Sequence, residues 1–208
     1  MRLYHHPLSS NARRAVMAAL QLAPHLPEPV ELVLVDLTQG EHRQPDFLRL
    51  NPQGKVPVLV DGDFALTESH AIMEYLAERA PGQTLWPADA QARADVNRWM
   101  FWSAQHLMPP VSVLNWERFV KGLTGAGAPD AAREAAGEAE CRAALTALDT
   151  HLNGRTWVAG DALSLADLAL AAPLMHAQTA RLPLDGLPHL AAWAARVQAL
   201  PAWQQTEG

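Results

Sequence analysis

The sequence predicts an α/β domain followed by an all-helical domain, and two observations support that division. Strand-like apolar runs and a hairpin turn signal at residues 61–63 occur only in the first third of the chain. Beyond residues 82–88, apolar residues recur only at the three- and four-residue spacing of helices. The predicted domains are therefore residues 1–81 and residues 89–208, joined by a linker at residues 82–88.

The first 81 residues alternate between strand and helix signals. We expect strands at residues 2–4, 30–36, 56–60 and 64–66, and helices after Asn11, near residues 47–50 and from Ser69. The order is strand, helix and strand, then helix, hairpin and helix. It is the order of a thioredoxin-like domain.

The second predicted domain shows helical stripes and helix-start signals. A stripe from Val96 to Leu107 is expected to end at Pro109 and Pro110, since proline interrupts a helix. A long helix is expected to start after Asp130 and to bury Cys141. Ser164 followed three residues later by Asp167 is close to a capping box. Leu190, Trp193, Val197 and Leu200 predict a last amphipathic helix before Pro201.

Composition and charge narrow the classes of function. The 208 residues have a net charge of −6, 49% apolar residues and 18% charged residues, as in soluble globular proteins. Lys and Arg form no basic stripe, so nucleic acid is not an expected partner. No apolar run reaches the roughly 18 residues of a membrane span, and the start of the chain has no signal-like core. The single cysteine, Cys141, excludes an internal disulfide and fits a cytoplasmic location.

Three features of residues 56–69 together indicate a binding site for a small peptide. Pro57 has no N–H for a sheet, which leaves the backbone N–H and C=O of Val56 free to pair with a peptide. The helix that starts at Ser69 offers free N–H groups and a hydroxyl to an anion. The carboxylate of Glu68 can hold an ammonium group. A peptide with a carboxylate and an amine at one end would satisfy all three.

This stretch resembles the glutathione-binding half of the glutathione transferase family, and the similarity extends over nearly the whole chain. The family pairs a Val-Pro before strand three with Glu-Ser or Gln-Ser at the next helix start. The resemblance implies a cis proline and glutathione as co-substrate. The glutathione-binding residues it implies are His42, Gln53, Lys55, Val56, Pro57, Glu68 and Ser69.

The resemblance also implies a catalytic hydroxyl at the start of the first helix. Family members with the pattern Ser-x-Pro/Asn-x-Arg use the first serine, which is Ser9 here, and Arg13 completes the pattern. Ser10 and Asn11 are the next candidates. Ser9 to Asn11 also suit simple helix capping. Beta-class members carry a catalytic cysteine in this region, and this chain has none, so it resembles the serine type of bacterial theta-like or zeta-like members.

The remaining expectations concern the second substrate and the partners. Trp102, His106 and Trp116 are candidates for an apolar electrophile pocket, although tryptophan at such spacing is more often core. The nine histidines show no chelating spacing, so no metal site is expected. The resemblance implies a cytoplasmic homodimer with a role in detoxification.

Three alternative functions stay open at this point. An isomerase of the maleylacetoacetate type would use the same thiolate, but that branch has cysteine where this chain has Asn11. A glutathione-dependent disulfide reductase or peroxidase is the second alternative. A non-catalytic glutathione-binding stress module is the third, and retention of Ser9, Val56-Pro57 and Glu68-Ser69 argues against it.

Overall fold

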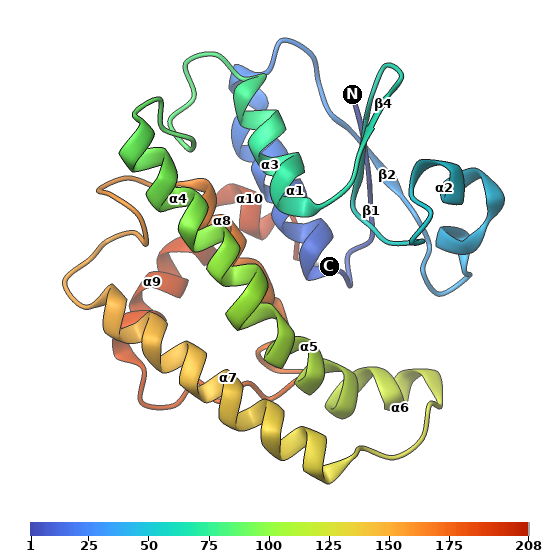
Figure 1. The fold of residues 1–208 in the computed structure, drawn as a ribbon, viewed down its shortest axis with the longest axis vertical. Helices are drawn as coiled ribbons and strands as arrows, with labels where there is room; N and C mark the ends of the chain where they lie inside the picture. The colour runs from blue at the N-terminus through green and yellow to red at the C-terminus, as the bar shows by residue number, and fades with distance from the viewer. Residues whose placement is uncertain (208) are drawn as a thin grey trace. The chain divides into compact units, whose positions relative to one another are not determined.

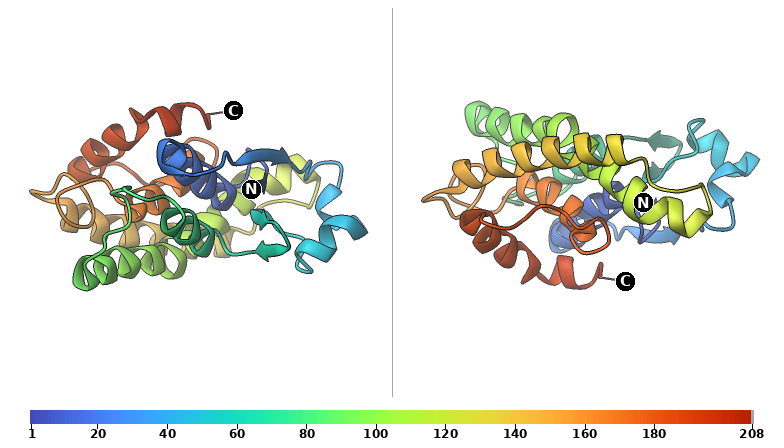
Figure 2. Two further views of the ribbon diagram at one scale, coloured as in Figure 1. Left: turned by 90° about the horizontal axis from the view of Figure 1, so that it is seen from above. Right: turned by 90° about the horizontal axis from the view of Figure 1, so that it is seen from below.

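The computed structural model describes residues 1–207, which form two compact units (Figures 1 and 2). The first unit comprises Met1–Pro87 together with the residues from Ala199 onward, and the second comprises Ala88–Gln198. The first is α/β and the second is helical, which confirms the predicted fold class.

A four-stranded sheet forms the centre of the first unit. Its strands are β1 (Arg2–His5), β2 (Glu31–Leu34), β3 (Val58–Asp61) and β4 (Phe64–Leu66), in the order β2-β1-β3-β4. β1 pairs with β2 in parallel, whereas the pairs β1–β3 and β3–β4 are antiparallel. The hairpin joins Asp61 to its partner Phe64 across Gly62 and Asp63, as the sequence predicted.

The helices of the first unit surround this sheet or pack on one another. They are α1 (Ser10–Leu22), α2 (Pro45–Leu50), α3 (Ser69–Glu78) and α10 (Pro201–Gln204), with short 3-10 turns η1 (Ala23–His25) and η2 (Glu41–Arg43), and α10 packs on α1. α1 and α3 run side by side, with the strands between them and α2 in the view of Figure 1. The element order predicted for a thioredoxin-like domain is therefore confirmed.

β2 is an edge strand and is shorter than predicted. It covers four residues of the expected run from 30 to 36, and its Leu32 and Leu34 are 40% and 59% exposed. Burial still alternates along this segment, since Leu32 and Leu34 are exposed whereas Val33 is half-buried and Val35 is buried. One face of the strand therefore packs on the core and the other faces outward.

The C-terminal segment belongs to the first unit, whereas the sequence prediction had grouped residues 89–208 together. The guanidinium of Arg13 on α1 lies 3.8 Å from the ring centroid of Trp203. Arg13 also donates to the Trp203 carbonyl at 3.2 Å and to Thr206 Oγ1 at 3.0 Å. Arg13 completes the sequence pattern that begins at Ser9, and these contacts give it a structural role.

The second unit consists of helical segments. They are α4 (Ala90–Trp102), η3 (Ser103–Leu107), α5 (Met108–Asn115), η4 (Trp116–Val120), α6 (Lys121–Thr124), α7 (Ala131–Leu152), α8 (Leu165–Ala171), η5 (Ala172–His176) and α9 (Pro188–Gln198). Asp130 caps α7 by accepting from the backbone N–H groups of Ala132 and Arg133. Cys141 is fully buried, as predicted, and burial raises the pKa of its thiol to about 11.

The expectation that Pro109 and Pro110 end a helix is wrong. The chain stays helical from Ala90 to Thr124, because the prolines occupy the first turn of α5, where their missing N–H groups cost little. The preceding segment η3 is a π-helix, and the N–H of Met108 reaches back five residues to the carbonyl of Ser103. A second π-helical segment, η4, follows α5.

A buried carboxylate organises the start of α8. Asp167 Oδ2 accepts from the backbone N–H and the hydroxyl of Ser164, both at 2.9 Å, which confirms the capping box. Asp167 Oδ1 accepts from the backbone N–H of Val158 at 2.9 Å and from Trp193 Nε1 at 2.8 Å. The same carboxylate therefore ties α9 and the loop before α8 to the helix that it caps.

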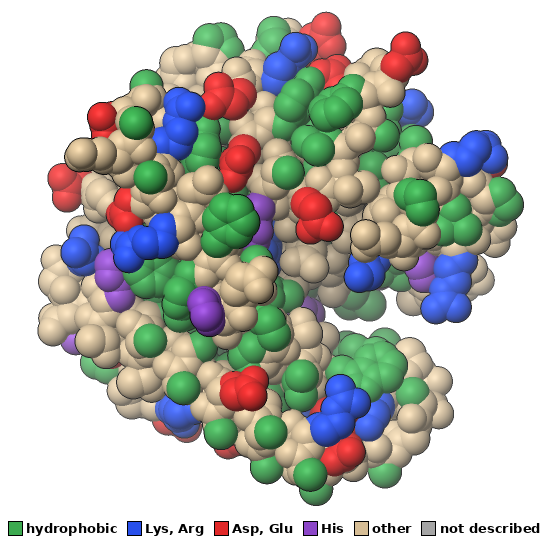
Figure 3. All heavy atoms as spheres, viewed as in Figure 1, with side chains coloured by type: hydrophobic (Ala, Val, Ile, Leu, Met, Phe, Trp, Pro, Cys, Tyr) green, Lys and Arg blue, Asp and Glu red, His purple; other side chains and the backbone are tan. Residues whose placement is uncertain are grey.

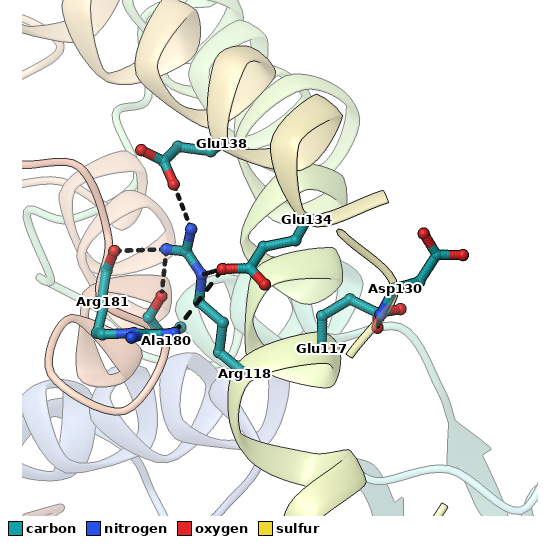
Figure 4. A network of polar contacts seen from close by, with 7 residues as sticks. All are labelled: Glu117, Arg118, Asp130, Glu134, Glu138, Ala180 and Arg181. Carbon is teal, nitrogen blue, oxygen red and sulfur yellow. Dashed lines mark hydrogen bonds and ion pairs between the residues drawn. The ribbon is translucent and has the colours of Figure 1, made fainter. Parts of the chain in front are cut away.

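A second polar network fixes the segment that carries Trp116 (Figure 4). The side chain of Arg118, only 5% exposed, donates to Glu134 Oε1 at 2.7 Å and also to Glu138. It donates further to the carbonyls of Ala180 and Arg181 at 3.0 and 2.7 Å. Arg118 therefore ties η4 to α7 and to the loop after η5.

On the face in Figure 3, positive and negative side chains are interspersed, and no broad patch of one sign is visible. Within residues 1–207, no helix is long and apolar enough to cross a membrane.

Candidate active site

The loop before β3 presents the backbone at Val56. The Val56–Pro57 peptide bond is cis, as the resemblance implied, and β3 begins only at Val58. The buried Asn51 holds this loop: its Nδ2 donates to the Lys55 carbonyl at 2.7 Å, and its Oδ1 accepts from the Gln53 backbone N–H at 3.1 Å. The turn is thus pinned from inside while Gln53 and Lys55 stay exposed.

His42 lies against the same loop. A side chain at Gly54 would place its Cβ 2.9 Å from the carbonyl oxygen of His42, and the φ angle of Gly54 is +61°. Both facts require glycine at this position. The close approach brings η2, which carries His42, next to the turn that carries Gln53 and Lys55. Nδ1 of His42 is buried and has no hydrogen-bond partner among residues 1–207.

The start of α1 places one candidate hydroxyl as a cap. Ser9 is partly buried, and its Oγ accepts from the Ala12 backbone N–H at 3.2 Å. Because Oγ is the acceptor in this bond, its O–H remains available to donate elsewhere. Ser10 is buried and Asn11 is exposed. Capping and catalysis are therefore compatible at Ser9.

The start of α3 is an uncapped helix terminus. Glu68, the residue before α3, makes no side-chain cap, and its φ angle of +66° is in the left-handed region, which is unfavourable for a residue with a side chain. The first intrahelical bond joins the Ile72 N–H to the Glu68 carbonyl. The N–H groups of the first turn, including that of the buried Ser69, have no partner within the helix.

Two contacts connect the loop before β3, the start of α1 and the start of α3. Ala12, in the first turn of α1, belongs to the same buried cluster as Val56 and Val58. Two residues further along α1, Nη1 of Arg14 lies 2.6 Å from Nε2 of His70 in the first turn of α3. The beginning of α1 is thus tied both to the Val56 backbone and to the beginning of α3.

Because Arg14 and His70 are both basic residues, their contact determines the protonation state of the imidazole. Arginine can only donate, so Nε2 of His70 accepts and the ring is neutral. Burial, with a smaller contribution from the Arg14 charge, lowers the pKa of His70 to about 3. Burial lowers the pKa of Arg14 to about 9, so Arg14 remains charged at neutral pH.

This pair predicts a loss of stability in acid. Between the folded pKa of about 3 and the ordinary value of 6.5, the unfolded chain binds a proton at His70 that the folded chain does not. The contribution of the neutral His70 to the free energy of unfolding is therefore complete above pH 6.5. Below pH 6.5 the free energy of unfolding falls by up to about 1.4 kcal/mol per pH unit. His70→Gln, which keeps an acceptor for Arg14, should lose less free energy of unfolding than the parent between pH 7 and pH 5. Urea unfolding at both pH values measures this.

The matched control is His25→Gln, since His25 is exposed. The control should follow the parent at both pH values. If His70→Gln loses as much stability on acidification as the parent does, His70 is not the group responsible.

The predicted pocket residues of the helical unit form an aromatic row. The ring centroids of Trp102 and His106 are 5.8 Å apart, and those of Trp99 and Trp102 are 5.3 Å apart. His106 and Trp116 lie on the two π-helical segments η3 and η4 and are exposed, whereas Trp102 is partly buried. π-Helical turns occur frequently at functional sites. Their role as pocket lining stays a prediction.

Two protein-family models match the chain. One is the glutathione S-transferase N-terminal domain, over residues 1–78, and the other is the glutathione S-transferase C-terminal domain, over residues 106–201. The chain belongs to the glutathione S-transferase family. The resemblance inferred from the sequence is thereby confirmed, and the chain is an enzyme of the transferase type that uses glutathione.

Individual glutathione S-transferases are similar over most of the chain. Glutathione S-transferase 3 of Zea mays is 39% identical, covering 99% of this chain and 92% of that protein. Glutathione S-transferase theta-2B of Homo sapiens is 38% identical, covering 82% of this chain and 71% of that protein. A solved glutathione S-transferase I bound with lactoylglutathione is 27% identical, with a TM-score of 0.85, 99% coverage of this chain and 97% of that one.

Two residues of this transferase were missed by the sequence reasoning. Asn51 had been assigned only to a turn, although asparagine beside Pro-x-Gly is a typical residue for side-chain bonds to a following backbone. Arg14 gave no signal at all, because its partner His70 is 56 residues away in the sequence.

Proposed function

We propose that this transferase is of the serine type and that Ser9 activates the glutathione thiol. The observation that carries the proposal is the bond from the Ala12 N–H to Ser9 Oγ, which orients the hydroxyl and leaves its proton to donate. The glutathione thiol would lose its proton to solvent, and the resulting thiolate would accept a hydrogen bond from the Ser9 O–H. Ser9 acts as a donor and forms no covalent bond to substrate. Ser10 and Asn11 are the neighbouring candidates for this role.

Glutathione is proposed to lie across the three tied parts of the first unit. Its cysteinyl backbone pairs with the N–H and C=O of Val56, beside the cis Pro57. Its γ-glutamyl carboxylate accepts from the first turn of α3 and from the Ser69 hydroxyl. Its ammonium group meets the exposed Glu68 carboxylate. Its glycine carboxylate meets His42 and Lys55, with Gln53 alongside.

The second substrate is proposed to be a small electrophile held by the helical domain. The pocket is proposed to come from the helical domain that begins at residue 89, with Trp102, His106 and Trp116 as its lining. The thiolate attacks the electrophilic carbon, a C–S bond forms, and the leaving group or a proton balances the charge. The alternative functions use the same thiolate. An isomerase would release glutathione unchanged, whereas reduction of a disulfide or a peroxide would consume a second glutathione as the reductant.

The proposed assembly is a cytoplasmic homodimer with a role in detoxification. Each unit exposes large aromatic side chains, with Phe64 49% exposed in the first and Phe101 62% exposed in the second. We propose that these side chains are buried against a second copy of the chain. Sedimentation should give about twice the chain mass of 22.6 kDa, whereas a single-chain mass would contradict the dimer.

Binding and turnover test the proposed function together. The parent should bind glutathione in isothermal titration calorimetry and should consume at least one of four electrophile classes, namely aryl halides, peroxides, disulfides and unsaturated acids. Ser69→Ala should weaken glutathione binding by about tenfold, because a hydrogen bond to a charged group is lost. Ser164→Ala, in the other unit, is the matched control and should bind like the parent. Equal binding by Ser69→Ala and the parent would place the carboxylate elsewhere.

A further inference from the structure

Arg14 is a buried cation without a counter-ion. Its side chain is 1% exposed, and it forms no ion pair with a carboxylate among residues 1–207. Its single hydrogen bond joins Nη1 to His70, while Nε and Nη2 are buried without a partner in the described chain. A buried charge in this state is costly to the folded protein.

The neighbouring Arg13, in the same helix, differs from Arg14 because its guanidinium has hydrogen-bond partners. It is 7% exposed and makes two hydrogen bonds to the C-terminal segment, with Trp203 stacked on its guanidinium. Arg14 has instead been placed behind the first turn of α3, in contact with the residue that directly follows Ser69. The free N–H groups of that turn already favour a negative charge.

The contact between Arg14 and His70 also decides which charges lie at the first turn of α3. Because Nε2 of His70 accepts from Arg14, the imidazole is neutral and adds no opposing charge. The fixed positive charge of Arg14 and the positive end of the α3 dipole therefore act in the same direction. Their effects add for an anion at the first turn and have no effect on a neutral group there.

We propose that Arg14 is a positioning residue for glutathione whose buried charge, acting through His70 and the first turn of α3, favours binding of the γ-glutamyl carboxylate. This inference rests on the proposed function. It assigns the counter-ion of a buried arginine to the substrate, so that the charge is balanced only in the complex. Arg14 itself does not touch the thiol.

A comparison of two ligands separates this role from a merely structural one. The ligands are glutathione and 4-aminobutanoyl-cysteinyl-glycine, which lacks only the γ-glutamyl carboxylate. Both are titrated calorimetrically into the parent, Arg14→Met, Arg14→Lys and, as the matched control, Arg13→Met. Arg14→Met should weaken glutathione binding by about tenfold, which is about 1.4 kcal/mol, and should change the Kd of the analogue by less than about twofold. Arg14→Lys, which keeps a charge, should restore most of the preference for the carboxylate.

The control variant and two contrary results distinguish failure of this inference from failure of the proposed function. Arg13→Met should change the two affinities by the same factor, since Arg13 faces the C-terminal segment. An equal loss of both ligands in Arg14→Met would overturn the inference and leave Arg14 a structural residue. No binding of glutathione by the parent would overturn the proposed function and the inference with it. Should Arg14→Met not fold, Arg14→Gln, which keeps a donor for His70, is measured in the same way with the same criteria.

Discussion

Ser9→Ala is expected to lower kcat/KM with glutathione by about 10²-fold, as the loss of one oriented donor does in other active sites. The thiol of a free cysteine has a pKa of about 8.5 and is only a few per cent ionised at neutral pH. Lowering that pKa by about two units requires about 2.7 kcal/mol. One hydrogen bond to a charged acceptor contributes about 1.5–3 kcal/mol and a helix N-terminus about 0.3–1 kcal/mol. One hydrogen bond from the Ser9 hydroxyl, at the N-terminus of α1, is therefore sufficient to lower the thiol pKa by this amount.

The measurement is the pKa of the bound thiol, followed by thiolate absorbance, together with the Kd for glutathione. The pKa should rise in Ser9→Ala while the Kd changes little, because the peptide contacts are elsewhere. Since Ser9 also caps α1, Ser9→Asn serves as the control that keeps a capping oxygen. Ser10→Ala and Asn11→Ala should titrate like the parent. A thiol pKa in Ser9→Ala equal to that of the parent would remove Ser9 from the mechanism.

Asp167→Ala is expected to reduce the free energy of unfolding by about 3–5 kcal/mol, because it removes a buried carboxylate from groups that need it. The substitution leaves the N–H groups of Val158, Ser164 and Trp193 without their acceptor. Trp193 is fully buried, so water cannot replace the carboxylate there. Burial raises the pKa of Asp167, and the four hydrogen bonds oppose that rise.

Urea unfolding followed by tryptophan fluorescence measures the effect. Asp161→Ala is the matched control, since Asp161 is an exposed aspartate just before the same helix. It should stay within about 0.5 kcal/mol of the parent. Ser164→Ala should lie between the two, because it removes one hydroxyl and leaves the backbone bond. A loss below about 1 kcal/mol in Asp167→Ala would mean that the carboxylate is not central to the helical unit.

Local chemistry made much of the fold predictable. The hairpin at Asp61, the cap at Asp130 and the box from Ser164 to Asp167 each depend on residues within a few positions of one another. The turn set before Val56 and the acidic residue before Ser69 belong to the same class. Such signals depend on neighbouring residues and not on tertiary contacts, and they were enough to predict the order of the elements in the first unit.

What the sequence did not reveal depends on contacts between distant residues. The pair of Arg14 and His70 and the stacking of Arg13 on Trp203 join positions that no local pattern connects. The continuous helix through Pro109 was hidden because proline is normally a stop signal, whereas here it lies in the first turn of α5, directly after a π-helical segment. Which of the proposed site residues touch glutathione stays a prediction for the same reason.

The two π-helical segments have a consequence for how such an enzyme diversifies. Each π turn holds one residue more than an α turn, and one residue corresponds to about 100° of rotation about the helix axis. The additional residue in Ser103–Leu107 therefore sets the direction in which the side chains of the following helical segments, Trp116 included, point from the helix axis. Gaining or losing one residue there would rotate the buried Val111 and Leu114 of α5 together with the exposed side chains, so such a change requires the packing around α5 to change as well.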